Sequence, residues 1–540
     1  MHETKKQNYL KGAAILAAAS IIVKIVSAIY KIPLFNDNVL GDAGAGTFQV
    51  TYSIYNLMLA ISTAGIPVAL SRMVSSASAN NKIPLVKRYF SVAMPIFMLI
   101  GLVVMAVMFI FADSFAALLR DTKAAPGIRV LAPAVFFVCI ISVYRGYAQG
   151  FENMIPTAVS QIVEVVCKTI FGIAIALWLV HMGYAQHIVS AGATMGVTLG
   201  LGLCIPILIW YKRKIDRRLP AGEGEDELPS RSRVLGRILK VSVPITLSSS
   251  FMSIMVVIDN SIVLGRLQYG LNLSELEARQ QFGIYTKGLT VYSLPPALVV
   301  PVSMSIIPAI AAALARRREG EASSIMQSSV KLVNLIAMPA AAGLMVLASP
   351  ILVALFNDAR QVSATVMIVL GAASFFVSLQ YITTAILQSN GHEKVALMTF
   401  PIGAFVNIML GFILVPNPKF GIVGSTIGTL ACFVVISAIN IVLIMKMVKE
   451  KPKFTGAFIK PLICSAIMSA VAYLLYMLVS RLGSGLIGTG RFAVILYLIV
   501  AIVVAIAVYF ILIIATRTVT KEDMLLVPKG EKLAKLLHIR

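Results

Sequence analysis

Apolar blocks of about twenty residues, separated by short polar or basic stretches, run through the whole chain and constrain its fold more than any other feature. A helix of that length crosses the hydrocarbon core of a bilayer, roughly 30 Å thick, with every backbone polar group bonded internally. Only 13% of the residues are charged, whereas about a quarter of a soluble protein is. The pattern predicts an all-α integral membrane protein and excludes a soluble one.

Fourteen transmembrane helices are predicted from these blocks. The predicted spans are 10–33, 46–70, 89–112, 126–148, 157–180, 187–211, 238–264, 283–311, 328–356, 361–388, 395–416, 422–446, 457–480 and 493–516. The start of the chain lacks a small-residue cleavage site after its first apolar stretch, so we expect a retained helix and no signal peptide.

Basic residues set the predicted orientation. The chain has 46 Lys and Arg against 23 acidic residues, and loops rich in Lys and Arg stay in the cytoplasm. The largest basic cluster lies between the sixth and seventh spans, in the segment 212–237. We therefore expect a multi-pass protein of the cell membrane with both termini cytoplasmic. The positive charge is explained by the bilayer, and no nucleic-acid-binding motif accompanies it.

Three short patterns recur in the same order and predict an internal repeat. Gly46 and Tyr55 recur as Gly283 and Tyr292, 237 residues later. Gln149 recurs as Gln388 after 239 residues, and Gly192 as Gly424 after 232. Since each copy holds six spans, both insert with the same orientation, and a pseudo-two-fold axis along the membrane normal relates them, with a cavity between the copies. The predicted parts are an N-lobe at 1–211, the basic linker at 212–237, a C-lobe at 238–449, and two extra helices with a cytoplasmic tail at 450–540.

Prolines concentrate in the predicted eighth span, where Pro295, Pro301 and Pro308 follow one another. Each removes a helix hydrogen bond and tends to bend the helix. We expect this span to act as a gate hinge.

Charged residues within the spans are candidate functional residues, because a charge at bilayer depth must pair or face water. Lys24 lies in the middle of the first span with no acidic residue within two turns. It is either a contact for an anionic substrate or one half of an ion pair with another helix, such as the pair it would form with Asp259. Lys31, nearer the end of the span, can extend its amine to the interface.

In the fifth span, Gln161, Glu164 and Lys168 share one helix face. Glu164 and Lys168 are four residues apart and can neutralise one another. The alternative is a site for a coupling ion, H⁺ or Na⁺, at Glu164, and Asp259 in the seventh span can serve either purpose.

Three further cations and an amide are candidates for substrate binding. Lys287, near the start of the eighth span, is either a second cavity cation or a headgroup contact. Arg145 with Gln149, and Arg72, end the fourth and second spans, where they can guide a phosphate.

Catalytic and cofactor motifs are missing from the sequence. It contains no P-loop, nucleotide-binding glycine motif or nucleophile elbow, and its Cys and His residues have no metal-ligand spacing. Glu275, Glu277 and Arg279, in the longest outer loop, resemble a solvated turn. We expect a transporter without metal or cofactor, and not a membrane-embedded glycosyltransferase.

The stretch from Arg145 to Gly150 (RGYAQG), followed by Pro156 to Glu164 (PTAVSQIVE), resembles the polysaccharide-biosynthesis, stage V sporulation protein B-like branch of the multidrug/oligosaccharidyl-lipid/polysaccharide exporter superfamily. The stretches around Lys24 and from Gly65 to Arg72 also fit this branch.

The resemblance implies a V-shaped pair of six-helix bundles that works by alternating access. It implies a partner substrate of undecaprenyl-diphosphate-linked sugar, most commonly lipid II, with other lipid-linked oligosaccharides as the alternative. Lys24 and Lys287 match basic positions of lipid II flippases, but this chain has Tyr30 and Lys31 where that branch has an arginine–aspartate pair. A cation-coupled multidrug exporter is a second alternative, which Lys24 disfavours because it repels cationic drugs.

Overall fold

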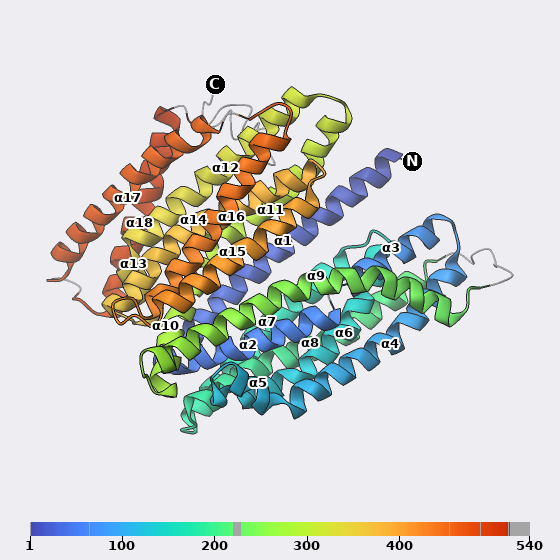
Figure 1. Cartoon of the computed structure of the whole chain (residues 1–540), viewed down its shortest axis with the longest axis horizontal. Helices are drawn as coiled ribbons and strands as arrows, with labels where there is room; N and C mark the ends of the chain where they lie inside the picture. The colour runs from blue at the N-terminus through green and yellow to red at the C-terminus, as the bar shows by residue number, and fades with distance from the viewer. Residues whose placement is uncertain are drawn as a thin grey trace. The chain divides into compact units, whose positions relative to one another are not determined.

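The computed structural model describes residues 2–63, 65–219, 228–452, 454–485, 488–516 and 518, and these residues form helices joined by short connections (Figure 1). The helices are α1 (His2–Leu34), α2 (Gly41–Thr63), α3 (Ile66–Ala79), α4 (Ile83–Ile110), α5 (Ala112–Leu118), η1 (Thr122–Ala124), α6 (Ala125–Gly150), α7 (Ile155–His181), α8 (Gln186–Asp216), α9 (Arg231–Gly265), η2 (Arg266–Gly270), α10 (Glu275–Tyr292), α11 (Leu294–Ala315), α12 (Glu319–Val346), α13 (Ala348–Phe356), α14 (Gln361–Ser389), α15 (Glu393–Leu414), α16 (Ile422–Met447), α17 (Thr455–Gly483) and α18 (Arg491–Ala515).

Twelve helical segments of the described chain are long and apolar enough to cross a membrane. They correspond to all the predicted spans except the first and the eighth. The first contains α1, whose side chains up to residue 14 lie outside the described set. The eighth is divided between α10 and α11. The membrane-spanning, all-helical class predicted from the sequence is therefore confirmed.

Three predicted spans, the second, the eighth and the ninth, are each divided into two helices near prolines; the ninth breaks between α12 and α13, just before Pro350. The eighth breaks at Ser293, because α11 restarts with prolines in its first turn, where a missing N–H costs no hydrogen bond. Pro301 and Pro308 lie inside α11, and their side chains are outside the described set. The second span breaks near Gly65, whose N–H donates to Thr246 Oγ1 at 3.3 Å, and α3 begins with Pro67 in its first turn. Prolines here start helices and do not merely bend them.

The first compact unit comprises Met1–Gln268 and Asn272–Gly283. Within it α6 packs on α2, α3, α4 and α8, and α7 packs on α1 and α8. Helix α9 packs on α2, α3 and α4 and so belongs to this unit, whereas the sequence repeat grouped its residues with the second half. Buried side chains from α3, α4, α6 and α9, including Leu70, Tyr89, Tyr147 and Ile238, form the core.

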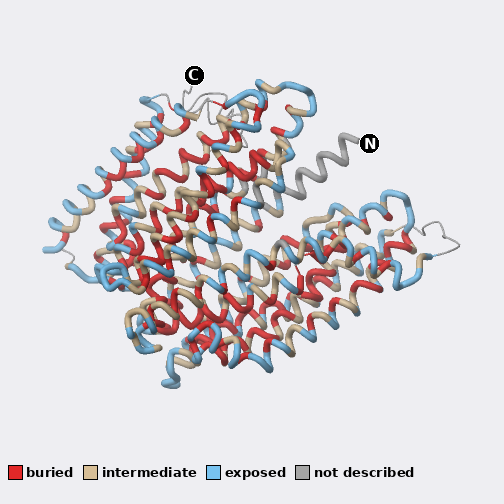
Figure 2. The backbone as a smooth tube through the Cα atoms, viewed as in Figure 1, coloured by how far each residue is buried: buried red, intermediate tan, exposed pale blue. Residues whose placement is uncertain are grey.

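The second unit comprises Tyr269–Leu271 and Ile284–Arg540. Helices α11, α12, α14, α16 and α17 share a core of aliphatic side chains, among them Ile310, Val333, Ile382 and Ile444. Helices α17 and α18 pack on one another (Figure 1). Large apolar side chains of α18 are exposed, Val503, Phe510 and Ile511 among them, as expected of a helix whose solvent is lipid. Figure 2 colours the backbone by burial, with exposed residues in pale blue.

Helices α2 and α10 approach one another at the two glycines of the predicted repeat. A Cβ on Gly46 would lie 2.4 Å from the carbonyl oxygen of Arg279, and one on Gly283 would lie 1.9 Å from that of Asp42. Both distances are shorter than any contact a side chain tolerates, so only glycine fits. Residue 279 follows residue 42 by the same repeat offset by which Gly283 follows Gly46. Each copy of the repeat therefore makes the same contact with the other.

Candidate functional site

Helix α1 carries two lysines on one face. Lys24, Ser27 and Lys31 are spaced three and four residues apart, which places them on the same side of a helix. Lys24 is exposed and Lys31 partly buried. Lys24 makes no ion pair or hydrogen bond with the part of the chain that the structure describes, so the ion pair with Asp259, the alternative to a substrate contact, is not formed.

Helix α7 adds a third amine to this face, because α7 packs against α1. Lys168 Nζ donates to Ser27 Oγ at 3.3 Å and lies 5.4 Å from the ring centroid of Tyr30. Lys31 Nζ lies 5.9 Å from the ring centroid of Phe35 and is close enough to Lys168 for the two charges to repel. We call Lys24, Lys31 and Lys168 the α1–α7 lysine face. Two like charges held together within membrane spans favour an anion between them.

A polar ladder joins α6 to the other end of the same α7 face. Arg145 donates from Nε to Ser160 Oγ at 2.9 Å and from a terminal nitrogen to Glu164 Oε2 at 3.1 Å. One turn further, Gln149 donates to Thr157 Oγ1 at 3.2 Å. The expected pairing of Glu164 with Lys168 is therefore corrected. Arg145 of the neighbouring helix forms the ion pair with Glu164. Lys168 hydrogen-bonds to α1 and feels the Glu164 charge without a close ion pair among the described contacts.

The remaining candidate residues lie on α3, α9, α10 and α11. Arg72 is exposed on α3. Asp259 is partly buried on α9 and takes part in a polar interaction there. Lys287 belongs to the second unit, where it is 1% exposed and its amine lies 5.9 Å from the ring centroid of Phe356. Pro295 lies in the first turn of α11.

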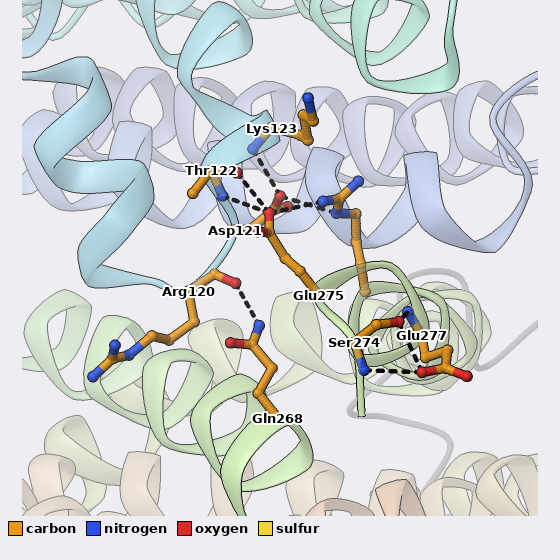
Figure 3. A network of polar contacts seen from close by, with 9 residues as sticks. Arg120, Asp121, Thr122, Lys123, Gln268, Ser274, Glu275 and Glu277 are labelled. Carbon is orange, nitrogen blue, oxygen red and sulfur yellow. Dashed lines mark hydrogen bonds and ion pairs between the residues drawn. The ribbon is translucent and has the colours of Figure 1, made fainter. Parts of the chain in front are cut away.

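A polar network that the sequence did not reveal links the α5–α6 connection to the start of α10 (Figure 3). Arg279 Nε lies 3.0 Å from Asp121 Oδ1, and another guanidinium nitrogen donates to Glu275 Oε1 at 2.8 Å. The N–H and hydroxyl of Thr122 donate to the same Glu275 oxygen. The side chain of Asp121 is fully buried and that of Arg279 is 9% exposed. The interpretation of this segment as a solvated turn is therefore wrong for Arg279, which is buried, whereas Glu277 is exposed as expected.

Electrostatics differ between the two acids of this network. Burial raises the pKa of Asp121, although the neighbouring Arg279 charge opposes the rise. Burial also acts against ionisation of Glu275, but hydrogen bonds from Thr122 and the charge of Arg279 outweigh it and lower its pKa. The network fixes the start of α10 beside Gly46. It could have been anticipated only from the glycine repeat, which places residues 42 and 279 at matching positions.

No group of three or more potential metal ligands gathers within the described ranges. The polar groups that the structure brings together on α1, α6 and α7 are amines, amides, hydroxyls and one carboxylate. Such a set can bind an anion and position a sugar, and it contains no nucleophile activated by a base.

Residues 9–314 match a protein family described as polysaccharide biosynthesis protein. Three relatives come from Bacillus subtilis. The uncharacterized membrane protein YabM is 27% identical over 98% of this chain and 97% of its own length. Stage V sporulation protein B is 24% identical over 86% and 90%. The lipid II flippase MurJ is 22% identical over 74% and 76%.

Two solved structures share the fold. Lipid II flippase MurJ in an inward closed conformation superimposes with a TM-score of 0.67 at 16% identity, over 92% of this chain and 98% of that one. An inward-facing multidrug resistance transporter of the MATE family in the MOP superfamily gives 0.61 at 16% identity, over 78% and 92%. Both likenesses concern the fold alone.

Proposed function

The chain belongs to the polysaccharide biosynthesis protein family, and from that premise we propose that it is a flippase of the MOP exporter superfamily for an undecaprenyl-diphosphate-linked cell-wall precursor, lipid II. The protein carries the precursor across the cell membrane by alternating access and leaves both termini in the cytoplasm. It has fourteen spans, the twelve apolar segments together with α1 and the α10–α11 pair, and the two six-helix repeats form the walls of a V-shaped cavity.

The α1–α7 lysine face carries this proposal. A diphosphate headgroup leaves water only if cations replace its hydration, and a charge-assisted hydrogen bond is about twice as strong as a neutral one. Lys24 has no carboxylate partner among the described residues. Lys168 hydrogen-bonds to a hydroxyl and lies beside a ring, and Glu164, whose charge acts on it, forms its ion pair with Arg145. These amines therefore keep their charge available for a phosphate, while the precursor's lipid tail stays in the bilayer.

Other lipid-linked oligosaccharides carry the same diphosphate, which the lysines cannot tell apart. The choice of lipid II as the substrate therefore rests on the relatives alone. A multidrug exporter of the MATE type has the same fold. Such an exporter for cationic drugs needs an acidic cavity, and the face described here presents three lysines. The lysines favour the anionic substrate.

Complementation tests the proposal. A bacterial strain depleted of its lipid II flippase grows when the wild-type chain is expressed, fails with Lys24→Ala, and recovers with Lys24→Arg, which restores the charge. Lys394→Ala, which removes an exposed lysine at the start of α15, is the matched control and supports growth. All variants are compared at equal membrane abundance. Normal growth with Lys24→Ala would remove the substrate contact from the proposal.

Failure of the wild-type chain to complement calls for transport assays with purified precursors. Proteoliposomes then receive lipid II or an undecaprenyl-diphosphate sugar without the peptide. Movement of the second alone replaces lipid II by another lipid-linked oligosaccharide. Movement of neither, with resistance to cationic dyes instead, overturns the flippase proposal.

A further inference from the structure

A cavity of about 310 Å³ lies in the first unit where α6, α7 and α8 come together. Its lining includes Lys214, Arg218, Tyr211, Phe151, Ile155 and Ile215, which we call the α6–α8 pocket. None of these residues belongs to the lysine face or to the polar ladder.

The pocket lies at the ends of three membrane spans. Helix α6 ends at Gly150, α7 begins at Ile155, and α8 ends at Asp216. A cavity at the junction of these ends lies at the level of the lipid headgroups, where amphipathic aromatic side chains collect. Tyr211 lines the pocket, and Trp210 stacks edge-on against it with ring centroids 4.8 Å apart.

The charge around the pocket is positive. Lys214 and Arg218 are exposed at its rim, and the Lys214 amine lies 5.0 Å from the ring centroid of Trp210. Asp216 does not offset them, because Lys212 pairs with it at 2.6 Å and the Tyr147 hydroxyl donates to it at 2.7 Å. Among the described residues, Glu152 is an exposed acid in the α6–α7 turn. The acidic run Glu223 to Glu227 follows Arg218 in the sequence and lies outside the described residues.

The apolar part of the lining decides what kind of anion fits. Phe151, Ile155 and Ile215 offer a surface that a free phosphate ion does not use, whereas the first carbons of an acyl chain gain from leaving water there. The basic residues are clustered on this side of the membrane, and the cytoplasmic leaflet is the one that carries anionic lipid.

We propose that the α6–α8 pocket binds an anionic glycerophospholipid of the cytoplasmic leaflet, with its phosphate between Lys214 and Arg218 and its upper acyl chain on Phe151 and Ile155. This site is separate from the route of the transported precursor. It anchors the α6–α7 turn to the membrane surface and makes the stability of the first unit depend on lipid composition.

The test uses the full-length chain purified in detergent and titrated with phosphatidylglycerol, with binding followed by native mass spectrometry and by thermal stability. Wild type binds phosphatidylglycerol and gains thermal stability, and phosphatidylcholine does neither. The double variant Lys214→Ser with Arg218→Ser binds about tenfold more weakly, because each cation near an anionic lipid contributes severalfold to binding.

The matched control is Arg213→Ser with Arg217→Ser, which removes two exposed charges at the same spacing, one in the last turn of α8 and one just after it, but outside the pocket lining. It keeps wild-type binding. Equal loss in both double variants would mean diffuse attraction and overturn the site. Inorganic phosphate that protects the protein as well as phosphatidylglycerol does would also overturn it, in favour of a free-anion site. Displacement of bound phosphatidylglycerol by an equimolar undecaprenyl-diphosphate sugar would reassign the pocket to the substrate.

Discussion

The α7–α8 pair of the first unit and the α15–α16 pair of the second pack in the same way and carry different side chains. A Cβ on Gly196 would lie 2.7 Å from the carbonyl oxygen of Lys168, and one on Gly428 would lie 2.9 Å from that of Asn407. Gly196 and Gly428 are equivalent in the sequence repeat, so Lys168 and Asn407 occupy equivalent places. Helix α7 has Glu164 and Lys168 there, whereas α15 has no charged residue after its first turn.

The comparison distinguishes the helix packing, which both copies of the repeat share, from the charged residues, which they do not. The close packing of the helices is present in both copies, because a bilayer offers little other drive for helices to associate than close contact. The charges of Glu164 and Lys168 have no counterpart on α15 of the second copy. We infer that the packing maintains the fold and that the first copy supplies the cationic chemistry.

The largest expected effect comes from breaking the shared packing. Gly196→Leu places a side chain against backbone of α7, with Gly172 N only 2.5 Å from the new Cβ. We expect a loss of about 3 kcal/mol or more, measured as loss of folded protein on size-exclusion chromatography.

Gly428 is more tolerant, because the atom nearest its Cβ is the side-chain oxygen of Asn407, which can rotate. Alanine at 196 therefore lowers the melting temperature more than alanine at 428. Gly411→Leu, at a position on α15 with open space, is the control and leaves the protein folded. Equal effects of the two leucine variants, or of the two alanine variants, would contradict the packing argument.

The next largest effect is on transport, and it distinguishes the charged position of the first copy, Lys168, from the uncharged one of the second, Asn407. Lys168→Met lowers the rate of precursor transport in proteoliposomes by about thirtyfold to a hundredfold, the equivalent of about 2 to 3 kcal/mol for a charged hydrogen bond. Asn407→Ala leaves the rate within about threefold, because it removes no charge. A comparable loss from Asn407→Ala would show that both copies bind substrate.

Lys287 tests whether the second unit contributes a cation of its own. It is buried against Phe356, so Lys287→Met removes a cation–π contact and lowers stability by about 1 kcal/mol. We expect transport per folded molecule to stay near wild type. Collapse of transport without a change in melting temperature would restore Lys287 as a substrate contact.

The last effect, similar in size to that of Lys287→Met, concerns Asp358, which follows α13 in the second unit. Burial acts against its ionisation, but hydrogen bonds from Arg360 and Ser363 outweigh burial and lower its pKa. The stabilisation is therefore complete above the usual aspartate pKa, near 4, and is lost as the pH falls through the lowered value. Asp358→Asn costs about 1 kcal/mol at pH 7, and denaturation curves of variant and wild type converge in acid. A difference that persists at low pH would contradict the charge assignment.

The sequence predicted the features that depend on local pattern. Twelve of the apolar blocks are helices of spanning length, and the breaks near Gly65 and Ser293 fall beside the prolines in the second and eighth spans. Periodicity also placed Glu164 and Lys168 on one face of α7. It could not show that Arg145 is closer to Glu164, because that depends on how α6 packs against α7.

The sequence did not predict the network around Arg279, for a related reason. Asp121 and Arg279 are far apart in sequence, and each stands in a polar connection that resembles a solvated loop. Only the approach of α2 and α10 buries them. Lys31 was likewise interpreted alone, and its proximity to Lys168 depends on the packing of α1 against α7.

The contact of Gly46 with residue 279 and of Gly283 with residue 42 has an evolutionary consequence. It is the reciprocal contact that two identical proteins make across a dimer axis, now made inside one polypeptide. A mutation that enlarges either glycine meets the backbone of the other copy, so neither duplicate can change there independently. After duplication, these two positions are held to one residue type while the lysines and carboxylates elsewhere were free to diverge.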